Sequence, residues 1–206
     1  MNVIETHIEK ILTHYTQGEH YELLKKAKEI YTQLTGKLDE ESDEYELRMN
    51  SFNDWFIFNF RRENDRRIID DYIFEFKIDD DLARSFHNIN YSLFSFLKTN
   101  LKKQIVLKDI LHDKKIALSK SLKHFGMVQD DLFVGRSIEH DGETYLLKGM
   151  CPLPGNILSN LKKQSKKVRK LNSHEEEEKF LLELERLKIK SLNYGHIDAN
   201  KIFIFK

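Results

Sequence analysis

Residues 132–147 read LFVGRSIEHDGETYLL, and this stretch is the clearest guide to the fold. An apolar run from Leu132 to Ile138 is followed by the pair Asp141-Gly142 and then by a second arm, residues 144–149. Asp-Gly between two such runs is a strong signal for a tight β-hairpin, because both central residues of its turn need a positive φ. We therefore expect an antiparallel hairpin here.

Three stretches upstream of the hairpin have the length and composition of short strands. They are residues 92–97, 105–111 and 115–118, with a turn expected at 112–114. Five short strands separated by turn signals are typical of a sheet that curls on itself. We predict a small, strongly curved antiparallel sheet or a partly closed barrel of the SH3 or OB type.

The segment before these strands lacks the residues that mark tight turns. Neither Gly nor Pro occurs between residues 37 and 125, whereas six of the eight glycines follow from Gly126 onward. Apolar residues recur at helical spacing in segments that begin near residues 3, 21, 47, 68 and 82. Gly36 is expected to end the second of these helices, and Ser42 is the candidate N-cap of the third.

Helical periodicity returns after residue 155. We predict one helix over residues 156–171 and a second that opens at the capping box formed by Ser173 and Glu176. The tail at 201–205 is expected either to add an edge strand or to dock on the core. The fold class is therefore α+β: a helical region over 1–90, a small β module over 91–150 and a C-terminal helical extension over 151–206. No flexible linker is visible, so we expect one cooperative unit.

Composition excludes several classes of protein. Lys and Arg number 34 and so do Asp and Glu, which removes any long-range attraction of the whole molecule to polyanions. Cys151 is the single cysteine, which rules out a disulfide scaffold and a thiolate zinc site. No apolar run approaches the ~18 residues of a membrane span, and residues 1–10 contain no signal-peptide core. We expect a cytoplasmic protein without a membrane partner.

The zero net charge hides a strong separation of charge along the chain. Residues 39–81 hold fifteen acids and six bases, whereas no acid occurs between Glu143 and Glu175. On a helix the bases in this gap would spread over much of the surface. They can contact phosphates or an acidic protein, or they can form a solvated face. Together with Arg136 of the β module, the candidate binding residues are Lys162, Lys163, Lys166, Lys167, Arg169 and Lys170.

Aromatic residues are concentrated between Phe52 and Phe96, which hold 12 of the 23 in the chain. The densest run, residues 52–60, could form a stacking platform for bases or the core between helices and sheet. We favour the core, because large aromatics dominate core energetics. Phe58 lies on the less apolar face and is the residue whose exposure would argue for stacking.

The arginine-rich segment 61–67 allows two further interpretations. Arg62 and Arg66 match half of a cyclic-dinucleotide-binding signature, but the other half is missing, so we expect them to pair with neighbouring acids. Asp65 or Asp70 with Glu75 and Lys77 imitates a Mg²⁺-dependent nuclease motif. That motif needs strands, whereas the apolar spacing here demands a helix.

No other group of residues suggests catalysis. The nine histidines lack the spacing of a zinc site, and Cys151 beside Pro152 is expected to be a small packed residue. No serine or cysteine has a nucleophile-elbow context, and no Gly-rich loop resembles a phosphate cradle. We therefore predict no catalytic residue, no metal and no cofactor.

Residues 52–155 resemble uncharacterised bacterial proteins of the SEC-C-motif-associated type. The matching pieces are the segment 52–61 (FNDWFIFNFR), the run 92–94 ahead of a strand, and residues 130–136 ahead of the Asp141-Gly142 hairpin. The resemblance implies a helical region joined to a small β-rich module. Many of those proteins carry a C-terminal cysteine-rich zinc motif, which is absent here, so the resemblance implies no metal role and no activity.

Three hypotheses for function follow. The first is a non-enzymatic interaction module that binds a protein partner through the β module and the basic helix. The second is a nucleic-acid-binding protein that uses the basic helix over residues 162–170. The third is an unrecognised metal-dependent hydrolase with Asp70, Glu75 and Lys77 as its site, and it requires those three side chains to converge.

Overall fold

The computed structural model describes residues 2–37, 40–120 and 128–205. Within these residues the chain begins with five α-helices, as the apolar spacing predicts, and a 3₁₀ turn at Gly18–His20 joins the first two. Gly36, at φ 94°, ends the second helix, also as predicted. The N-cap of the third is Glu44 rather than Ser42, whose hydroxyl instead accepts a hydrogen bond from the Glu44 amide. The helices are α1 (Val3–Tyr15), α2 (Tyr21–Thr35), α3 (Tyr45–Phe58), α4 (Ile68–Glu75) and α5 (Asp80–His87).

The β module is an antiparallel sheet in the order β3-β2-β1-β4-β5. The predicted hairpin joins β4 to β5, with Asp141 at φ 53° and Gly142 at φ 72° in its turn. The strand β6, which the sequence did not indicate, pairs with the first half of β4. The strands are β1 (Asn90–Thr99), β2 (Ile105–Asp109), β3 (Lys114–Ala117), β4 (Leu132–His140), β5 (Glu143–Leu146) and β6 (Cys151–Leu153).

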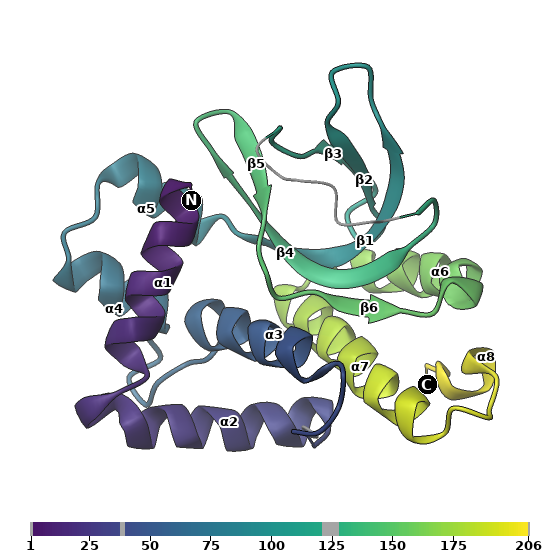
Figure 1. The fold of residues 1–206 in the computed structure, drawn as a ribbon, viewed down its shortest axis with the longest axis horizontal. Coiled ribbons are helices and arrows are strands. Elements are labelled where there is room, and N and C mark those ends of the chain that lie inside the picture. The colour runs from purple at the N-terminus through teal and green to yellow at the C-terminus, as the bar shows by residue number, and fades with distance from the viewer. Residues whose placement is uncertain (1, 38–39, 121–127, 206) are drawn as a thin grey trace.

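The sheet curls into a half-barrel, which confirms the predicted strong curvature (Figure 1). A parallel bridge between Leu118 and Thr144 brings the chain after β3 against β5. Inside the curl, Phe94, Leu107 and Phe133 form an apolar core. The α+β fold class predicted from the sequence is therefore correct.

The C-terminal helices follow a short 3₁₀ turn at Gly155–Ile157, so the helix expected from residue 156 begins two residues later. The capping box prediction places the next helix correctly, because Ser173 is its N-cap. The tail forms a short helix and no edge strand, and it docks through the fully buried Phe203. These helices are α6 (Leu158–Arg169), α7 (His174–Asn193) and α8 (Ala199–Ile202).

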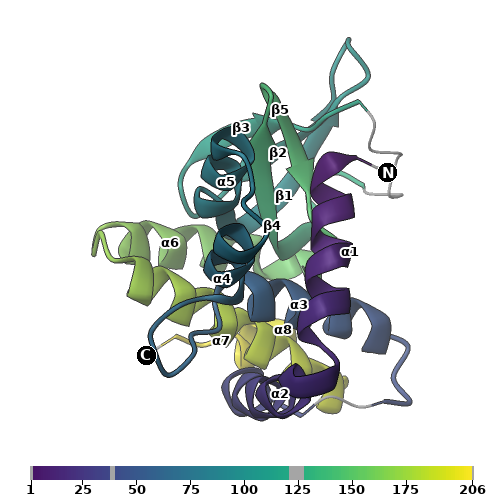
Figure 2. The same cartoon turned by 90° about the vertical axis from the view of Figure 1, so that its left-hand side faces the viewer.

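The helices pack against the sheet on two of its sides. Figure 1 shows α1, α4 and α5 to the left of the sheet and α2, α3 and α7 beneath it, and Figure 2 keeps α2 and α7 below the sheet after a quarter turn. The aromatic run 52–60 lies in the helical core, where Phe58 is 2% exposed. The prediction of a core instead of a stacking platform is thereby confirmed.

A buried ionic cluster joins the helices to the sheet at Glu185 of α7, which is 2% exposed. Its carboxylate accepts hydrogen bonds from the hydroxyls of Tyr31 in α2 and Tyr91 in β1. Arg48 of α3 donates to it at 3.1 Å and also donates to the carbonyl of Thr35. The Glu185 carboxylate thus links α2, α3 and β1 to α7.

None of the helices in the described part of the chain combines the length and the apolar character that a membrane span requires.

Candidate functional site

The basic helix predicted from the sequence is α6, and its lysines lie on one side. At 100° per residue, Lys162, Lys163, Lys166, Lys167 and Lys170 fall within an arc of about 140° and along about 12 Å of helix. All five are exposed, and none forms an ion pair with another described residue. The bases are therefore gathered into a stripe and do not spread over the helix as expected. We call these five residues the lysine face.

The opposite side of α6 is the reason for this arrangement. Leu161, Ser165 and Val168 are buried there, with Leu161 and Val168 in the core that α6 shares with α7 and the sheet. Arg169 belongs to neither side: it donates to the carbonyl of Leu111 and lies 3.7 Å from Asp113, in the turn between β2 and β3. The helix is thus fixed against the sheet and presents its lysines outward.

Arg136 is not a surface binding residue, which corrects the sequence prediction. It is 1% exposed and donates from Nε and Nη2 to the side-chain oxygen of Asn59, at 3.2 and 2.6 Å. Its guanidinium lies 3.7 Å from the centroid of the Tyr91 ring. The sequence could not show this, because helices cover the face of β4 that carries Arg136, and alternation along one strand does not reveal what covers it.

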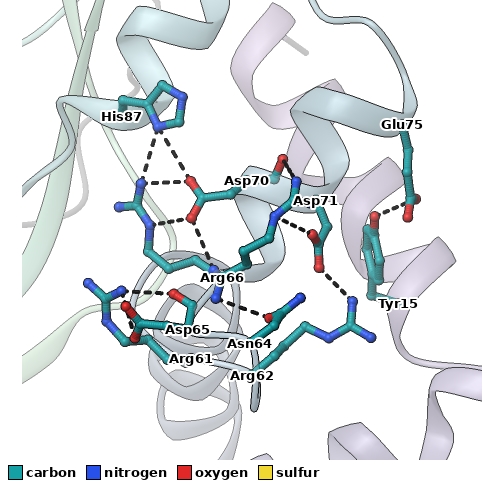
Figure 3. A network of polar contacts seen from close by, with 11 residues as sticks. Tyr15, Arg61, Arg62, Asn64, Asp65, Arg66, Asp70, Asp71, Glu75 and His87 are labelled. Atoms are coloured by element: carbon teal, nitrogen blue, oxygen red, sulfur yellow. Dashed lines mark hydrogen bonds and ion pairs between the residues drawn. The ribbon is translucent and has the colours of Figure 1, made fainter.

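The arginine-rich segment 61–67 is a network of ion pairs (Figure 3). Arg62 and Arg66 both bind the carboxylate of Asp71, at 2.5 and 2.9 Å, and Arg67 binds Asp70 at 2.8 Å. These arginines are therefore paired with neighbouring acids, as the sequence indicated. Two guanidiniums that share one carboxylate are not available as a phosphate clamp.

The proposed hydrolase residues do not form one site. Asp70 turns to Arg67 and His87, whereas Glu75 turns to the hydroxyl of Tyr15 at 2.6 Å, on a different side of α4 (Figure 3). Both acids are on a helix, as the apolar spacing demands. Among the described residues, no group of three His, Cys, Asp or Glu side chains could share a metal ion.

Sequence reasoning missed a polar groove of about 520 Å³. Its walls come from the loop after α3, the start of β1, the turn after β2 and the first turns of α7. These segments are up to about 120 residues apart, so no local motif could have indicated the groove. Polar lining residues include Asn59, Arg61, Arg67, Asn90, His112 and Glu178.

His112 lines this groove and bridges the sheet and α7. Its Nδ1 lies 3.0 Å from Asp109 and its Nε2 lies 3.5 Å from Glu177. The hydrogen bond to Asp109 is the main cause that raises the pKa of His112 above its ordinary value. Burial alone would raise the pKa of Asp109, but bonds from His112 and Ser92 hold it below its ordinary value. His112 therefore bridges Asp109 and Glu177, and this arrangement favours the protonated form of its imidazole.

The raised pKa gives a testable pH dependence. Because the imidazole binds its proton more tightly in the folded protein, its stabilisation is complete below the unfolded pKa of about 6.5 and is lost as pH rises through the folded pKa. The loss of unfolding free energy in His112→Gln should therefore be larger at about pH 5.5 than at about pH 8.5. Urea titrations at both pH values measure it.

His174→Gln is the matched control, because His174 also lies near Glu177 but is fully exposed. An equal loss in both variants at both pH values would contradict the assignment of the bridge to His112.

The comparisons with known proteins give one match. The model of a family of unknown function, DUF7986, matches residues 3–187. No curated protein and no solved structure matches the chain. The resemblance to SEC-C-motif-associated proteins stays a prediction. Since the match covers α1 to most of α7, it includes the sheet, the lysine face and the groove. The chain belongs to the family of unknown function DUF7986.

Proposed function

We propose that this protein is a non-enzymatic cytoplasmic interaction module that binds an acidic protein partner through the lysine face of α6. The observation that carries the proposal is that five exposed lysines lie on one side of a helix without ion pairs to described residues. The segments that flank them contain no acid from residue 144 to 174. A surface of this kind attracts carboxylates locally although the net charge of the chain is zero.

The β module extends this surface. Arg169 fixes the end of α6 to the turn between β2 and β3, and Lys115 lies beside that turn, opposite Lys108. Asp113 is the acid at this junction, and Lys108 and Arg169 both contact it.

A protein partner is favoured over nucleic acid by two features of the surface. The densest aromatic run, residues 52–60, lies in the core, where it cannot stack on bases. The free cations are lysines, which act as point charges, and not the arginines that bind phosphates through two parallel hydrogen bonds. Nucleic-acid binding is the alternative, and the same experiment decides between them.

The test uses poly-L-glutamate as the acidic probe and a short duplex DNA and a single-stranded RNA as the alternative probes. We expect the wild type to bind poly-L-glutamate, and the quadruple variant Lys162→Gln, Lys163→Gln, Lys166→Gln, Lys167→Gln to bind at least about tenfold more weakly, since exposed ion pairs contribute roughly 0.2–1 kcal/mol each. Fluorescence anisotropy at low salt measures both affinities.

A variant with the same loss of charge elsewhere is the control: Lys10→Gln, Lys25→Gln, Lys102→Gln, Lys103→Gln, all at exposed positions. It should bind as the wild type does. An equal loss in the control, or no binding of poly-L-glutamate, contradicts the proposal. Tighter binding of DNA or RNA, with a log–log salt slope near −0.9 (duplex) or −0.7 (single strand) per phosphate, would replace the protein partner with nucleic acid.

A further inference from the structure

Asn59 and Asn90 line the groove, and hydrogen bonds between each side-chain amide and neighbouring protein groups fix its orientation. Arg136 donates twice to the oxygen of Asn59, and an arginine offers donors only, so the amide nitrogen of Asn59 must point away from it. Asn90 is fixed in the opposite sense: its nitrogen donates to Asp109 at 3.1 Å and to Ser137 at 3.2 Å. Asp109 is a carboxylate, so it can only accept from Asn90.

The groove therefore presents a fixed donor and a fixed acceptor. No described residue accepts a hydrogen bond from Nδ2 of Asn59, and none donates to Oδ1 of Asn90, although both side chains line the groove. Polar groups that are positioned in advance and left without partners select ligands that complete them. A ligand edge that carries both an acceptor and a donor, such as the edge of a nucleobase, has the groups that complete both amides.

Charged groups lie on separate walls of the same groove. Arg61 and Arg67 come from the loop after α3, and Lys114 comes from β3. Arg61 pairs with Asp65 at 3.2 Å and Lys114 lies 3.9 Å from Asp109, but each side chain has further N–H donors beyond these contacts. Arg67 uses Nε and Nη2 for Asp70, which leaves Nη1 for a further acceptor. Glu178, from α7, forms no ion pair with a described residue, and carboxylates of this kind accept hydrogen bonds from ribose hydroxyls.

We propose that this groove binds a nucleoside monophosphate. Asn59 and Asn90 contact the edge of the base, Glu178 accepts from the ribose, and Arg61, Arg67 and Lys114 bind the phosphate. A volume of about 520 Å³ is within the range of pockets that hold ligands of this size. The site is separate from the lysine face, so it does not depend on the function proposed above. The same chemistry occurs in a free nucleotide and at the phosphorylated end of an RNA strand.

Isothermal titration of the full chain with AMP, GMP, CMP and UMP, the four nucleosides and inorganic phosphate tests the proposal. The informative variant is Asn59→Asp, which keeps an oxygen for Arg136 but removes the donor that faces the groove. We expect at least one nucleotide to bind more tightly than phosphate, and Asn59→Asp to weaken it about tenfold or more. Binding of the matching nucleoside should weaken by a similar factor in this variant. The nucleoside is uncharged, so repulsion between the new carboxylate and a phosphate cannot explain that loss. Lys162→Gln, on the lysine face, should leave binding unchanged.

Three results would overturn the proposal: no binding of any nucleotide at millimolar concentration, phosphate binding as tightly as the nucleotides, or unchanged affinity in a folded Asn59→Asp variant. Far-ultraviolet circular dichroism establishes whether that variant is folded, and if it is not, Lys114→Gln replaces it with the same expected loss for the nucleotide but not for the nucleoside. A 5′-phosphorylated RNA in the same titration identifies the source. Binding at least tenfold tighter than the free nucleotide supports a strand end, and weaker or equal binding supports the free nucleotide.

Discussion

Gly149→Ala should destabilise the protein by about 3–5 kcal/mol, which is one of the largest effects expected for a single methyl group in this fold. A Cβ at this position would lie 2.3 Å from Oδ2 of Asp54 and 2.7 Å from the backbone oxygen of Asn50. The second of these atoms belongs to the main chain of α3, so it cannot move without displacing the helix. The clash also breaks the 2.9 Å hydrogen bond that the Gly149 amide donates to Asp54.

Asp54 makes this loss more costly, because it is 3% exposed. Burial raises the pKa of Asp54 to about 6, against the opposing effects of Arg136 and the Gly149 amide. Without that amide, a buried carboxylate loses one of the groups that stabilise its charge, and hydrogen bonds to charged groups contribute about 1.5–3 kcal/mol. Urea-induced unfolding, followed by circular dichroism, measures the change.

Gly155→Ala is the matched control for this variant. The nearest atom to a Cβ at Gly155 is 3.9 Å away, and the backbone there has an ordinary negative φ. We expect its unfolding free energy to change by less than about 1 kcal/mol. If both variants unfold at the same urea concentration, the close approach of Gly149 to α3 does not limit stability.

Glu185→Ala should also cost about 3–5 kcal/mol, because it leaves the charge of Arg48 buried without its carboxylate. Arg48 is 7% exposed, and its second partner is a neutral backbone carbonyl. The hydroxyls of Tyr31 and Tyr91 would lose their acceptor in the same change. Glu185→Gln keeps an oxygen acceptor and is expected to lie between wild type and alanine. Chemical denaturation of the three proteins measures the order.

Glu183→Gln, two residues away on the same helix, is the control. Glu183 pairs with Arg186 on the surface, and exposed pairs contribute about 0.2–1 kcal/mol. A loss in Glu185→Ala that is no larger than the loss in Glu183→Gln would mean that the buried cluster does not hold α2, α3, α7 and the sheet together.

The elements that the sequence predicted well are those whose signals are local. The Asp141-Gly142 turn, the cap at Ser173 and the apolar spacing of α1 each depend on a few neighbouring residues, and each appears in the structure at the predicted place. The strand β6 was missed because three residues that contain Pro152 carry no strand pattern. It forms because β5 covers only residues 137–140 of its edge of β4, so residues 132–134 on that edge are left to pair with β6.

The candidate sites also differ in whether their signals are local in sequence. The helix was predicted correctly, but its bases were expected to spread over the surface, whereas helical geometry places five of them on one side. These five are Lys162, Lys163, Lys166, Lys167 and Lys170. The groove and the role of Arg136 could not be predicted. Asn59 and Arg136 are 77 residues apart, and only the packing of α3 against β4 brings them together.

By itself, then, the sequence determined most of the helices and strands, the curl of the sheet and the separation of charge along the chain. Tertiary structure decided which of those charges remain free. The arginines of residues 61–67 and the lysines of α6 are similar in sequence as clusters of bases. However, α4 brings Asp70 and Asp71 to the arginines, whereas the five lysines of the lysine face form no ion pair with a described residue. The reason is physical: helix periodicity, caps and tight turns depend on residues that are close in sequence, but the availability of a charge depends on every surface that folding brings to it.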